Sequence, residues 1–453
     1  MMKYVLSVML IKSLIWWGNG KKSNMLNILF QNILILLLII FMVNYSYIKL
    51  NMMDFYAISY NLGLDFFSFW MISLSIWIIV LMVLASMKIV KYKSFLCLFI
   101  VNLTLMLFFL ILSFSALNLL MFYVMFEASL IPTLFLILGW GYQIERIEAG
   151  MYMMLYTLFF SLPFLLMMFY IYDSTYSMDM EYMNMKKVDL DSIMYNFILM
   201  IFFVKIPMFT LHMWLPKAHV EAPVSGSMIL AGVMLKLGGY GIYRLMFISE
   251  ALTVDYGLSI VVYSLVGSVY LSLVCLRQVD MKSLVAYSSV VHMGLVIGGL
   301  FSLESIGIYG AFLMMISHGL CSSGLFCMVN MFYERSLSRS LIINKGMLSY
   351  CPSMMIMWFL LCVGNMSAPP SLNLISEIFL LISLVSLTNY FIIILMMFLF
   401  FSSCYSLYLY SYVCYGKSLG LFSFSMFSVR EFILILMHLI PLNLMILKID
   451  IFY

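Results

Sequence analysis

Long apolar segments separated by short polar connections recur along almost the whole chain. Most are close to the roughly 20 residues that a helix needs to cross the hydrocarbon core of a bilayer. The apolar runs are continuous, which favours helices over the alternating strands of a membrane barrel. The pattern predicts an all-α polytopic membrane protein of about 14 transmembrane helices, over residues 4–17, 25–45, 66–86, 94–113, 116–140, 150–172, 193–215, 225–249, 257–276, 283–303, 305–331, 353–387, 390–412 and 431–447.

Two of these segments depart from the pattern of a plain helix. The segment 193–215 carries Lys205 two residues before Pro207, and the segment 353–387 is too long for one straight span and holds a proline pair at Pro369. A proline inside a helix frees backbone carbonyls, which is tolerated at membrane depth only beside other protein or water. We therefore expect two discontinuous helices, one near Pro207 and one near Pro369.

The two interruptions occupy matching places along the chain. They fall in the seventh and twelfth predicted spans, which correspond in two consecutive units of five. Five spans reverse the orientation of the chain, so such units would be inverted repeats, and paired interruptions in them indicate a transport site at mid-membrane. The predicted parts are N-terminal helices in 1–93, a first repeat in 94–249, a second repeat in 257–412 and a C-terminal helix in 413–453.

Composition agrees with a chain whose solvent is lipid. The sequence is 65% hydrophobic and 9% charged, whereas a soluble domain carries about 25% charged residues. The net charge of +4 comes from scattered basic residues, so no nucleic-acid partner is expected. The eight cysteines include no CxxC pair, so neither an iron–sulfur cluster nor a structural zinc is expected. We expect free cysteines that fill space in the interior.

Basic residues at the ends of the segments predict the orientation in the membrane. Fourteen fall on one side and seven on the other, the smaller group being Lys3, Lys12, Lys49, Lys186, Lys187, Arg244 and Lys448. The positive-inside rule places the larger group in the cytoplasm or matrix. Both termini are then expected on the opposite side.

Four ionisable residues lie inside the apolar segments. Glu127, Lys205 and Lys236 are near the centres of their spans, and Glu377 lies off-centre beyond the proline pair at Pro369. A charge at mid-membrane costs about 2.5–3.5 kcal/mol and usually marks an ion or proton path. Because burial disfavours the charged forms and an opposite charge restores them, a Glu–Lys pair can hold or release a proton. The alternative is a structural ion pair joining two helices.

Histidines add further candidates. His292 and His318 lie near the middles of their spans, and His212 and His219 follow Lys205 at seven-residue spacings nearer a membrane edge. Histidine can pass protons on near neutral pH, but His292 and His318 could equally be interior histidines bonded to a backbone carbonyl. For His212 and His219 that structural role is slightly favoured. That structural role is favoured for His438. Haem ligation is disfavoured, because no helix carries two well-spaced histidines.

Four motifs carry a family resemblance. They are LPKAHVEAPVSGSMILAGVMLKLGGYG at 215–241, FEASLIPTLFLILGWGYQ at 126–143, SHGLCSSGLFC at 317–327 and NMSAPPSLNLISE at 365–377. Together they resemble chain 4 of NADH–ubiquinone oxidoreductase, respiratory complex I, over nearly the whole chain. The 45 methionines also resemble the composition of mitochondrially encoded insect subunits.

The resemblance implies an antiporter-like, proton-translocating subunit of the complex I membrane arm, with fourteen helices and two inverted five-helix repeats. It implies no redox centre on this chain, with NADH, FMN, iron–sulfur clusters and ubiquinone on other subunits. In such proteins Glu127 would pair with Lys205, Lys236 would be the central relay, and His292, His318 and Glu377 would continue the path. It further implies the mitochondrial inner membrane, with both termini in the intermembrane space. Its expected partners are other membrane-arm subunits, including the chain 2 and chain 5 homologues, and the lipid bilayer with its cardiolipin.

Proton translocation driven by quinone reduction elsewhere in the complex is thus the function expected. Two alternatives use the same buried charges. One is a subunit of a cation/proton antiporter, and the other is a structural membrane scaffold in which the charges only join helices.

Overall fold

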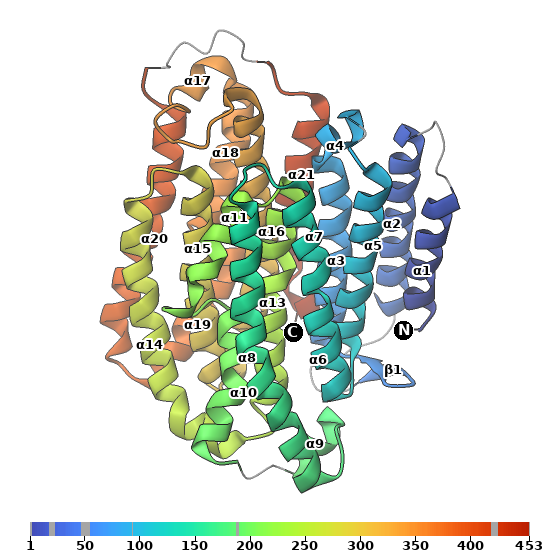
Figure 1. Cartoon of the computed structure of the whole chain (residues 1–453). Coiled ribbons are helices and arrows are strands. Elements are labelled where there is room, and N and C mark those ends of the chain that lie inside the picture. The colour runs from blue at the N-terminus through green and yellow to red at the C-terminus, as the bar shows by residue number, and fades with distance from the viewer. Residues whose placement is uncertain are drawn as a thin grey trace. The chain divides into compact units, whose positions relative to one another are not determined.

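The chain is an all-α polytopic membrane protein (Figure 1). The computed structural model describes residues 2–17, 23–46, 55–92, 94–186, 190–417 and 425–452. Within these residues ten helices are long and apolar enough to cross a membrane, and four shorter apolar helices accompany them. Lys49 and Lys187, which entered the predicted orientation, lie outside the described residues, as does the side chain of Lys12.

Ten of the predicted spans are single helices. In chain order they are α1 (Met2–Trp17), α2 (Ser23–Ser46), α3 (Phe66–Ala85), α5 (Leu96–Ser115), α8 (Arg146–Thr175), α14 (Glu250–Leu276), α15 (Met281–Phe301), α16 (Ser305–Ser336), α20 (Phe391–Cys414) and α21 (Val429–Leu444). The apolar pattern therefore located these helices to within a few residues. The number of membrane crossings stays a prediction.

The remaining four predicted spans are divided. Both predicted interruptions are confirmed, because α10 ends at Lys205 and α18 ends at Asn365. Two further divisions, in 116–140 and 225–249, were not predicted. The pieces are α6 (Leu119–Ala128) and α7 (Leu130–Trp140); α10 (Ser192–Lys205), η1 (Leu211–Met213) and α11 (Trp214–Glu221); α12 (Val224–Ile229), the π-helical turn η2 (Leu230–Met234) and α13 (Leu235–Leu245); and α18 (Pro352–Asn365) and α19 (Leu372–Leu387).

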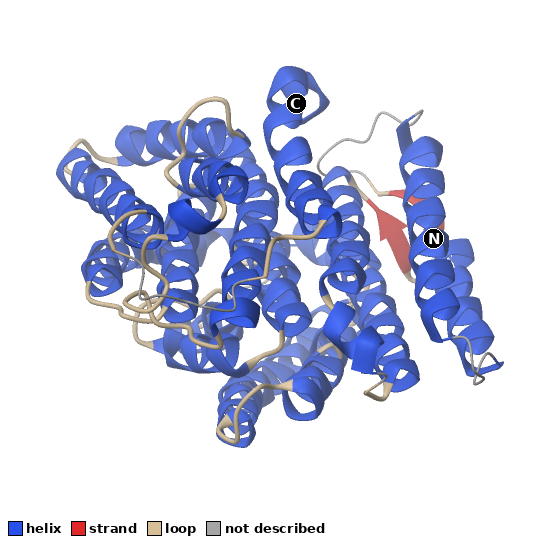
Figure 2. Cartoon of the chain, turned by 90° about the horizontal axis from the view of Figure 1, so that it is seen from above, coloured by secondary structure: helices blue, strands red, loops and turns tan. Residues whose placement is uncertain are grey.

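Short elements fill the connections. They are the antiparallel strands β1 (Tyr56–Ser59) and β2 (Leu62–Leu64), drawn red in Figure 2, with α4 (Met87–Tyr92), α9 (Met180–Lys186), α17 (Met347–Tyr350) and η3 (Met445–Phe452). The structure describes residues 173–186 and 190–191 of the polar connection 173–191, to which no role was assigned. This connection contains α9, whose Met180 N–H donates to the carbonyl of Leu117 just before α6, at 3.0 Å.

The chain forms two compact units. The first comprises Met1–Ile201 and Glu221–Glu250, and the second comprises Phe202–Val220 and Ala251–Tyr453. The end of α10 and α11 up to Val220 thus belong to the second unit, although they precede α12 and α13 of the first. The boundaries of the inverted repeats stay a prediction.

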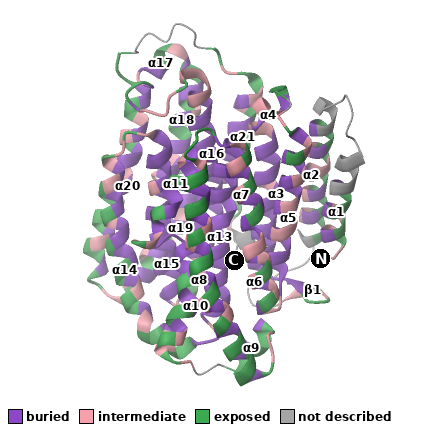
Figure 3. Ribbon diagram, in the orientation of Figure 1, coloured by how far each residue is buried: buried purple, intermediate pink, exposed green. Residues whose placement is uncertain are grey.

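Burial differs sharply between helices of the second unit. The membrane-spanning window of α16 is 100% buried and that of α15 is 94% buried, against 33% for α20. Figure 3 shows α16 in purple, whereas α14 and α20 carry green, exposed turns. Most exposed positions of α20 are apolar, among them Ile393, Met396 and Phe400, as expected of a surface that faces acyl chains.

Candidate functional site

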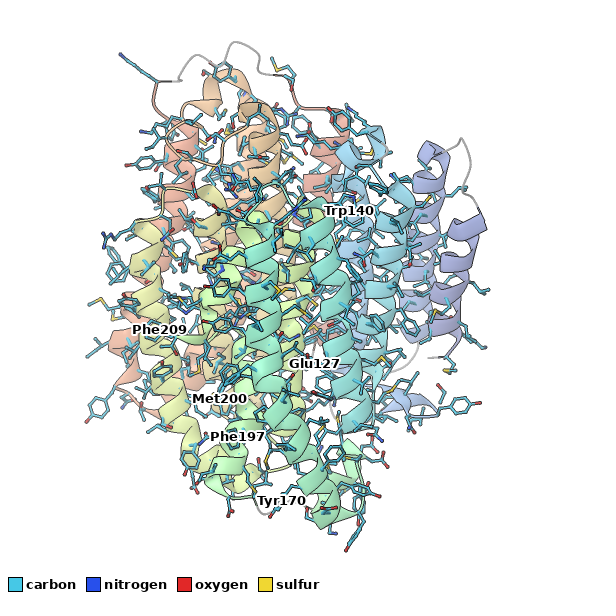
Figure 4. The ribbon with its side chains drawn as sticks, viewed as in Figure 1. Glu127, Trp140, Tyr170, Phe197, Met200 and Phe209 are labelled. Atoms are coloured by element: carbon cyan, nitrogen blue, oxygen red, sulfur yellow. The ribbon has the colours of Figure 1, made fainter. Side chains whose placement is uncertain are left out.

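Glu127 lies beside a break between two helices of the first unit. It is the penultimate residue of α6, and both of its carboxylate oxygens are buried; Figure 4 labels it on the α6–α7 segment. Pro132, in the first turn of α7, cannot donate to the carbonyl of Ala128 four residues earlier, and its ring crowds that oxygen. The break is therefore encoded by Pro132, a signal that the sequence contained and that was not used.

Lys236 lies next to a second irregularity of the first unit. It is fully buried and is the second residue of α13, directly after the π-helical turn η2. Its Nζ donates to the carbonyl of Ala231 within that turn. A π turn widens the helix by one residue and frequently marks a functional position. The ammonium group thus meets backbone oxygen in a segment that would otherwise be wholly apolar.

Arg244, expected at an exposed end of its span, is buried in the first unit. Its Nη2 lies 2.6 Å from Oδ2 of Asp65 and donates to the hydroxyl of Tyr240 at 2.8 Å. Asp65 caps α3, with its Oδ1 accepting from the Ser68 N–H at 3.0 Å. The guanidinium carbon lies 4.6 Å from the centroid of the Phe55 ring. Asp65 was not predicted, although an aspartate three residues before a serine at the start of an apolar run is a capping signal.

Lys205 belongs to the second unit and is the last residue of α10, with an exposed fraction of 2%. Beyond it the regular helical hydrogen bonds stop, because the N–H of Met208 donates to the carbonyl of Phe203. The carbonyl of Val204 is left over, and the indole N–H of Trp214 donates to it at 2.9 Å. The carbonyl that the break next to Lys205 leaves free is therefore hydrogen-bonded to a side chain and needs no water.

The second broken helix of this unit is closed in the same way. Gly364 lies near the end of α18, and its carbonyl accepts from Nδ2 of Asn373 in α19, at 2.6 Å. Asn373 lies one turn before Glu377 in α19, and both are buried, with exposed fractions of 1% and 4%. The capping side chain therefore fixes the half-helix that carries the carboxylate.

His212 and His219 lie in aromatic surroundings. The ring of His212, in η1, lies 6.1 Å from the Phe209 ring and 6.0 Å from the Tyr287 ring between centroids. The ring of His219, in α11, stacks on Phe326 of α16 at 4.7 Å and 4°. Both histidines are buried, and the structure does not bring these two into the cluster around His292.

Three predicted residues meet in the second unit. Nδ1 of His292 in α15 lies 3.5 Å from Oε1 of Glu377 in α19, and the His292 and His318 rings lie 5.4 Å apart between centroids. His318 comes from α16. All three side chains are buried. Glu377, off-centre in the sequence, is thus part of the cluster.

Tyr405 of α20 completes the cluster and was not predicted. Its hydroxyl lies 3.0 Å from Nε2 of His292. The chain holds 31 tyrosines, four of them between residues 405 and 412, so no sequence pattern distinguished this one. We name His292, His318, Glu377 and Tyr405 the His292 cluster.

A glycine allows the helices of the His292 cluster to approach closely. A Cβ placed on Gly310 of α16 would lie 2.9 Å from Cβ of Phe379 and 3.0 Å from the backbone nitrogen of Leu380, both in α19. Glycine is the residue that permits such contact between backbones. His318 follows Gly310 by about two turns, so this contact helps to hold α16 against the helix that carries Glu377.

The His292 cluster has the chemistry for holding and moving a proton. A histidine and a glutamate within 3.5 Å can exchange a proton between ring nitrogen and carboxylate oxygen, and each form is stabilised by the other group. His438, in contrast, has its Nδ1 bonded to the Leu434 carbonyl at 2.8 Å within α21, as expected of a structural histidine. Among the described residues, no group of three or more metal-ligating side chains is placed to hold an ion.

Two family models match adjoining parts of the chain. Residues 116–403 match the transmembrane NADH:quinone oxidoreductase/Mrp antiporter family. Residues 1–113 match the amino-terminal family of NADH-ubiquinone oxidoreductase chain 4. The first match contains all eight of the predicted site residues, from Glu127 to Glu377.

Individual proteins and structures resemble the chain over nearly its full length. A protein named NADH-ubiquinone oxidoreductase chain 4 from Ceratitis capitata is 49% identical over 99% of this chain and 97% of its own length. One of the same name from Aedes aegypti is 47% identical over 99% and 98%. A chain of respiratory complex I from Thermus thermophilus shares the fold with a TM-score of 0.85 at 21% identity, covering 98% of this chain and 94% of its own.

Proposed function

The chain belongs to the NADH-ubiquinone oxidoreductase chain 4 family, and from this membership we propose that it translocates protons through a relay of buried side chains. It is an antiporter-like, proton-translocating membrane-arm subunit of NADH:ubiquinone oxidoreductase. The family matches confirm the resemblance carried by the four motifs. The observation that carries the relay itself is the His292 cluster, in which a histidine and a glutamate are held within 3.5 Å in the interior of a membrane-spanning unit.

In the proposed relay, Glu127 pairs with Lys205 in the first half-channel of the proton path, and Lys236 is the central group. His292, His318 and Glu377 continue the path, and His212 and His219 are further sites near the break after Lys205. Burial supports this assignment, because Lys236, Lys205 and Glu377 are all at most 4% exposed. Moving one charge against 100 mV costs about 2.3 kcal/mol, which the changing partners of these groups must supply.

We propose the setting of the relay from the same membership and from the distribution of basic residues. The chain lies in the mitochondrial inner membrane with both termini in the intermembrane space, and its two interrupted helices belong to inverted repeats. NADH, FMN, iron–sulfur clusters and ubiquinone are bound by other subunits. Chain 2 and chain 5 homologues are its neighbours in the membrane arm, and cardiolipin is among the lipids around it.

Replacing Lys236 tests the central role. In the assembled complex in liposomes, Lys236→Ala is expected to abolish proton pumping, because the ammonium group that would carry the proton at the centre of the path is then removed. Lys236→Met, which keeps the length of the side chain, is expected to do the same. Proton uptake per NADH oxidised is the measurement, and the exposed Lys91→Ala serves as control. Normal pumping by both Lys236 variants would remove the central relay and favour the scaffold alternative.

A further inference from the structure

Tyr405 contacts His292 on the nitrogen that does not face Glu377. Its hydroxyl lies 3.0 Å from Nε2, while Nδ1 lies 3.5 Å from Oε1 of Glu377. We propose that Tyr405 is a positioning residue of the relay: it keeps Nε2 engaged, so that Nδ1 is the nitrogen that exchanges a proton with Glu377. This inference rests on the proposed function, because it assigns a role within the same path.

The geometry of α20 holds the imidazole of His292 in one orientation. Phe398 and Tyr405 are seven residues apart, about two turns, and therefore lie on the same face of the helix. Both rings meet His292 edge-on, Phe398 at 6.2 Å and 83° and Tyr405 at 6.5 Å and 78°. Both are fully buried. The imidazole ring of His292 thus packs against two aromatic side chains of one helix, and its two nitrogens face different partners.

A tyrosine hydroxyl suits this role because it can donate or accept. When it accepts from the Nε2–H of His292, Nδ1 is the remaining site of protonation. One proton can then leave Nδ1 of the imidazolium and arrive on Oε1 of Glu377, which turns the carboxylate into a carboxylic acid and the ring neutral. When the hydroxyl instead donates to Nε2, the ring proton stays on Nδ1 and the exchange stops. The partner of one histidine nitrogen commonly sets the state of the other.

The remaining groups around His292 do not take over this role. Glu377 of α19 faces Nδ1, and the ring of His318 from α16 lies at 46° to the His292 ring. The thiols of Cys275 in α14 and Cys321 in α16 are buried in the same unit and are weak donors. Phe398 is apolar. Among the described residues, Tyr405 is therefore the side chain whose hydrogen bond reaches Nε2.

The substitution Tyr405→Phe removes the hydroxyl and keeps the ring against His292. In the assembled complex in liposomes we expect proton pumping per complex to fall about tenfold. This is the lower end of the losses that follow removal of the hydrogen-bond partner that orients a metal-bound histidine. The pH profile of pumping should also move toward lower pH, because the imidazolium loses the acceptor for its Nε2–H. Tyr408→Phe is the matched control: it lies on the same helix, and its hydroxyl donates to the Gln278 carbonyl at 3.5 Å.

Two further measurements separate this inference from the relay. Pumping is expressed per flavin, so that poor assembly is not mistaken for slow pumping, and His292→Ala is measured beside Tyr405→Phe. Unimpaired pumping by His292→Ala would overturn the relay through this cluster. Loss in His292→Ala together with wild-type rate and pH profile in Tyr405→Phe would overturn only the role of Tyr405. A reduced rate with an unmoved pH profile would also overturn it, because a purely structural defect gives that result.

Discussion

At the scale of single residues, two kinds of ionisable pair can be distinguished. In one kind a proton can move between the partners, and in the other the protonation state of both partners is fixed. The His292–Glu377 pair is of the first kind, because the proton can reside on either group. The Asp65–Arg244 pair is of the second kind, because an arginine keeps its proton in proteins. Its partner Asp65 is the N-cap residue of α3. We therefore assign the Asp65–Arg244 pair to the stability of the first unit.

The substitution Asp65→Asn removes the negative charge of residue 65 while keeping its ability to cap α3. Asparagine caps a helix about as well as aspartate, but it leaves the Arg244 guanidinium buried without its counter-charge. Breaking one side of a buried ion pair costs about 3–5 kcal/mol. We expect a lower midpoint of thermal unfolding of the complex, measured in detergent, and no such change for Asp173→Asn, whose side chain is exposed. An unchanged midpoint for Asp65→Asn would show that water reaches Arg244.

At the scale of elements, each proposed acidic or basic relay residue lies close to an irregularity of its helix. Glu127 precedes the α6–α7 break, Lys205 ends α10, Lys236 follows the η2 turn and Glu377 lies in the second turn of α19. The breaks near Pro207 and Pro369 were predicted because the proline or the length of the segment signalled them. The η2 turn has no such signal, because π-helical hydrogen bonding depends on packing and leaves no fixed residue pattern.

The side chains that close the two broken helices should be costly to remove. Trp214→Phe leaves the Val204 carbonyl of α10 without the indole donor. Asn373→Leu removes the side-chain donor of the Gly364 carbonyl of α18, which still accepts from the Ser367 N–H at 3.2 Å. An unsatisfied buried polar group costs about 1–3 kcal/mol, so Trp214→Phe should unfold at lower temperature in the assembled complex. Asn373→Leu should lower the unfolding temperature less, because the Gly364 carbonyl keeps its backbone donor. The comparison is Trp140→Phe, whose indole donates to the Ser94 carbonyl at a half-buried place. An equal effect in all three variants would mean that lost aromatic or side-chain packing dominates.

At the scale of the whole molecule, the apolar pattern predicted most of the fold because every span must satisfy its backbone internally in lipid. The family resemblance also implied that His292, His318 and Glu377 lie along one path. It did not find Tyr405 or Asp65, because their roles depend on which helices become neighbours. Arg244 was expected at an exposed end of its span for the same reason, since its burial depends on Asp65 and Phe55, which are distant in the sequence.

Membership in a large assembly gives a prediction for the intact protein. A gentle detergent extraction is expected to recover the chain together with a flavin-containing NADH dehydrogenase, because the proposed pumping needs electron transfer on other subunits. The measurement is co-migration of the chain with flavin on a native gel. Recovery as a free transporter that exchanges a cation for protons in vesicles would instead favour the antiporter alternative.

The unequal burial of the helices has a consequence for biogenesis. Helices α15 and α16, the most enclosed of the second unit, are also the least hydropathic of the ten long helices. During synthesis each must enter the bilayer before α19, α20 and α21 have been made. For that interval polar groups such as His318 face lipid or the insertion machinery. Ribosome-bound intermediates that end between α16 and α19 are therefore the stage at which the nascent chain depends most on an insertase.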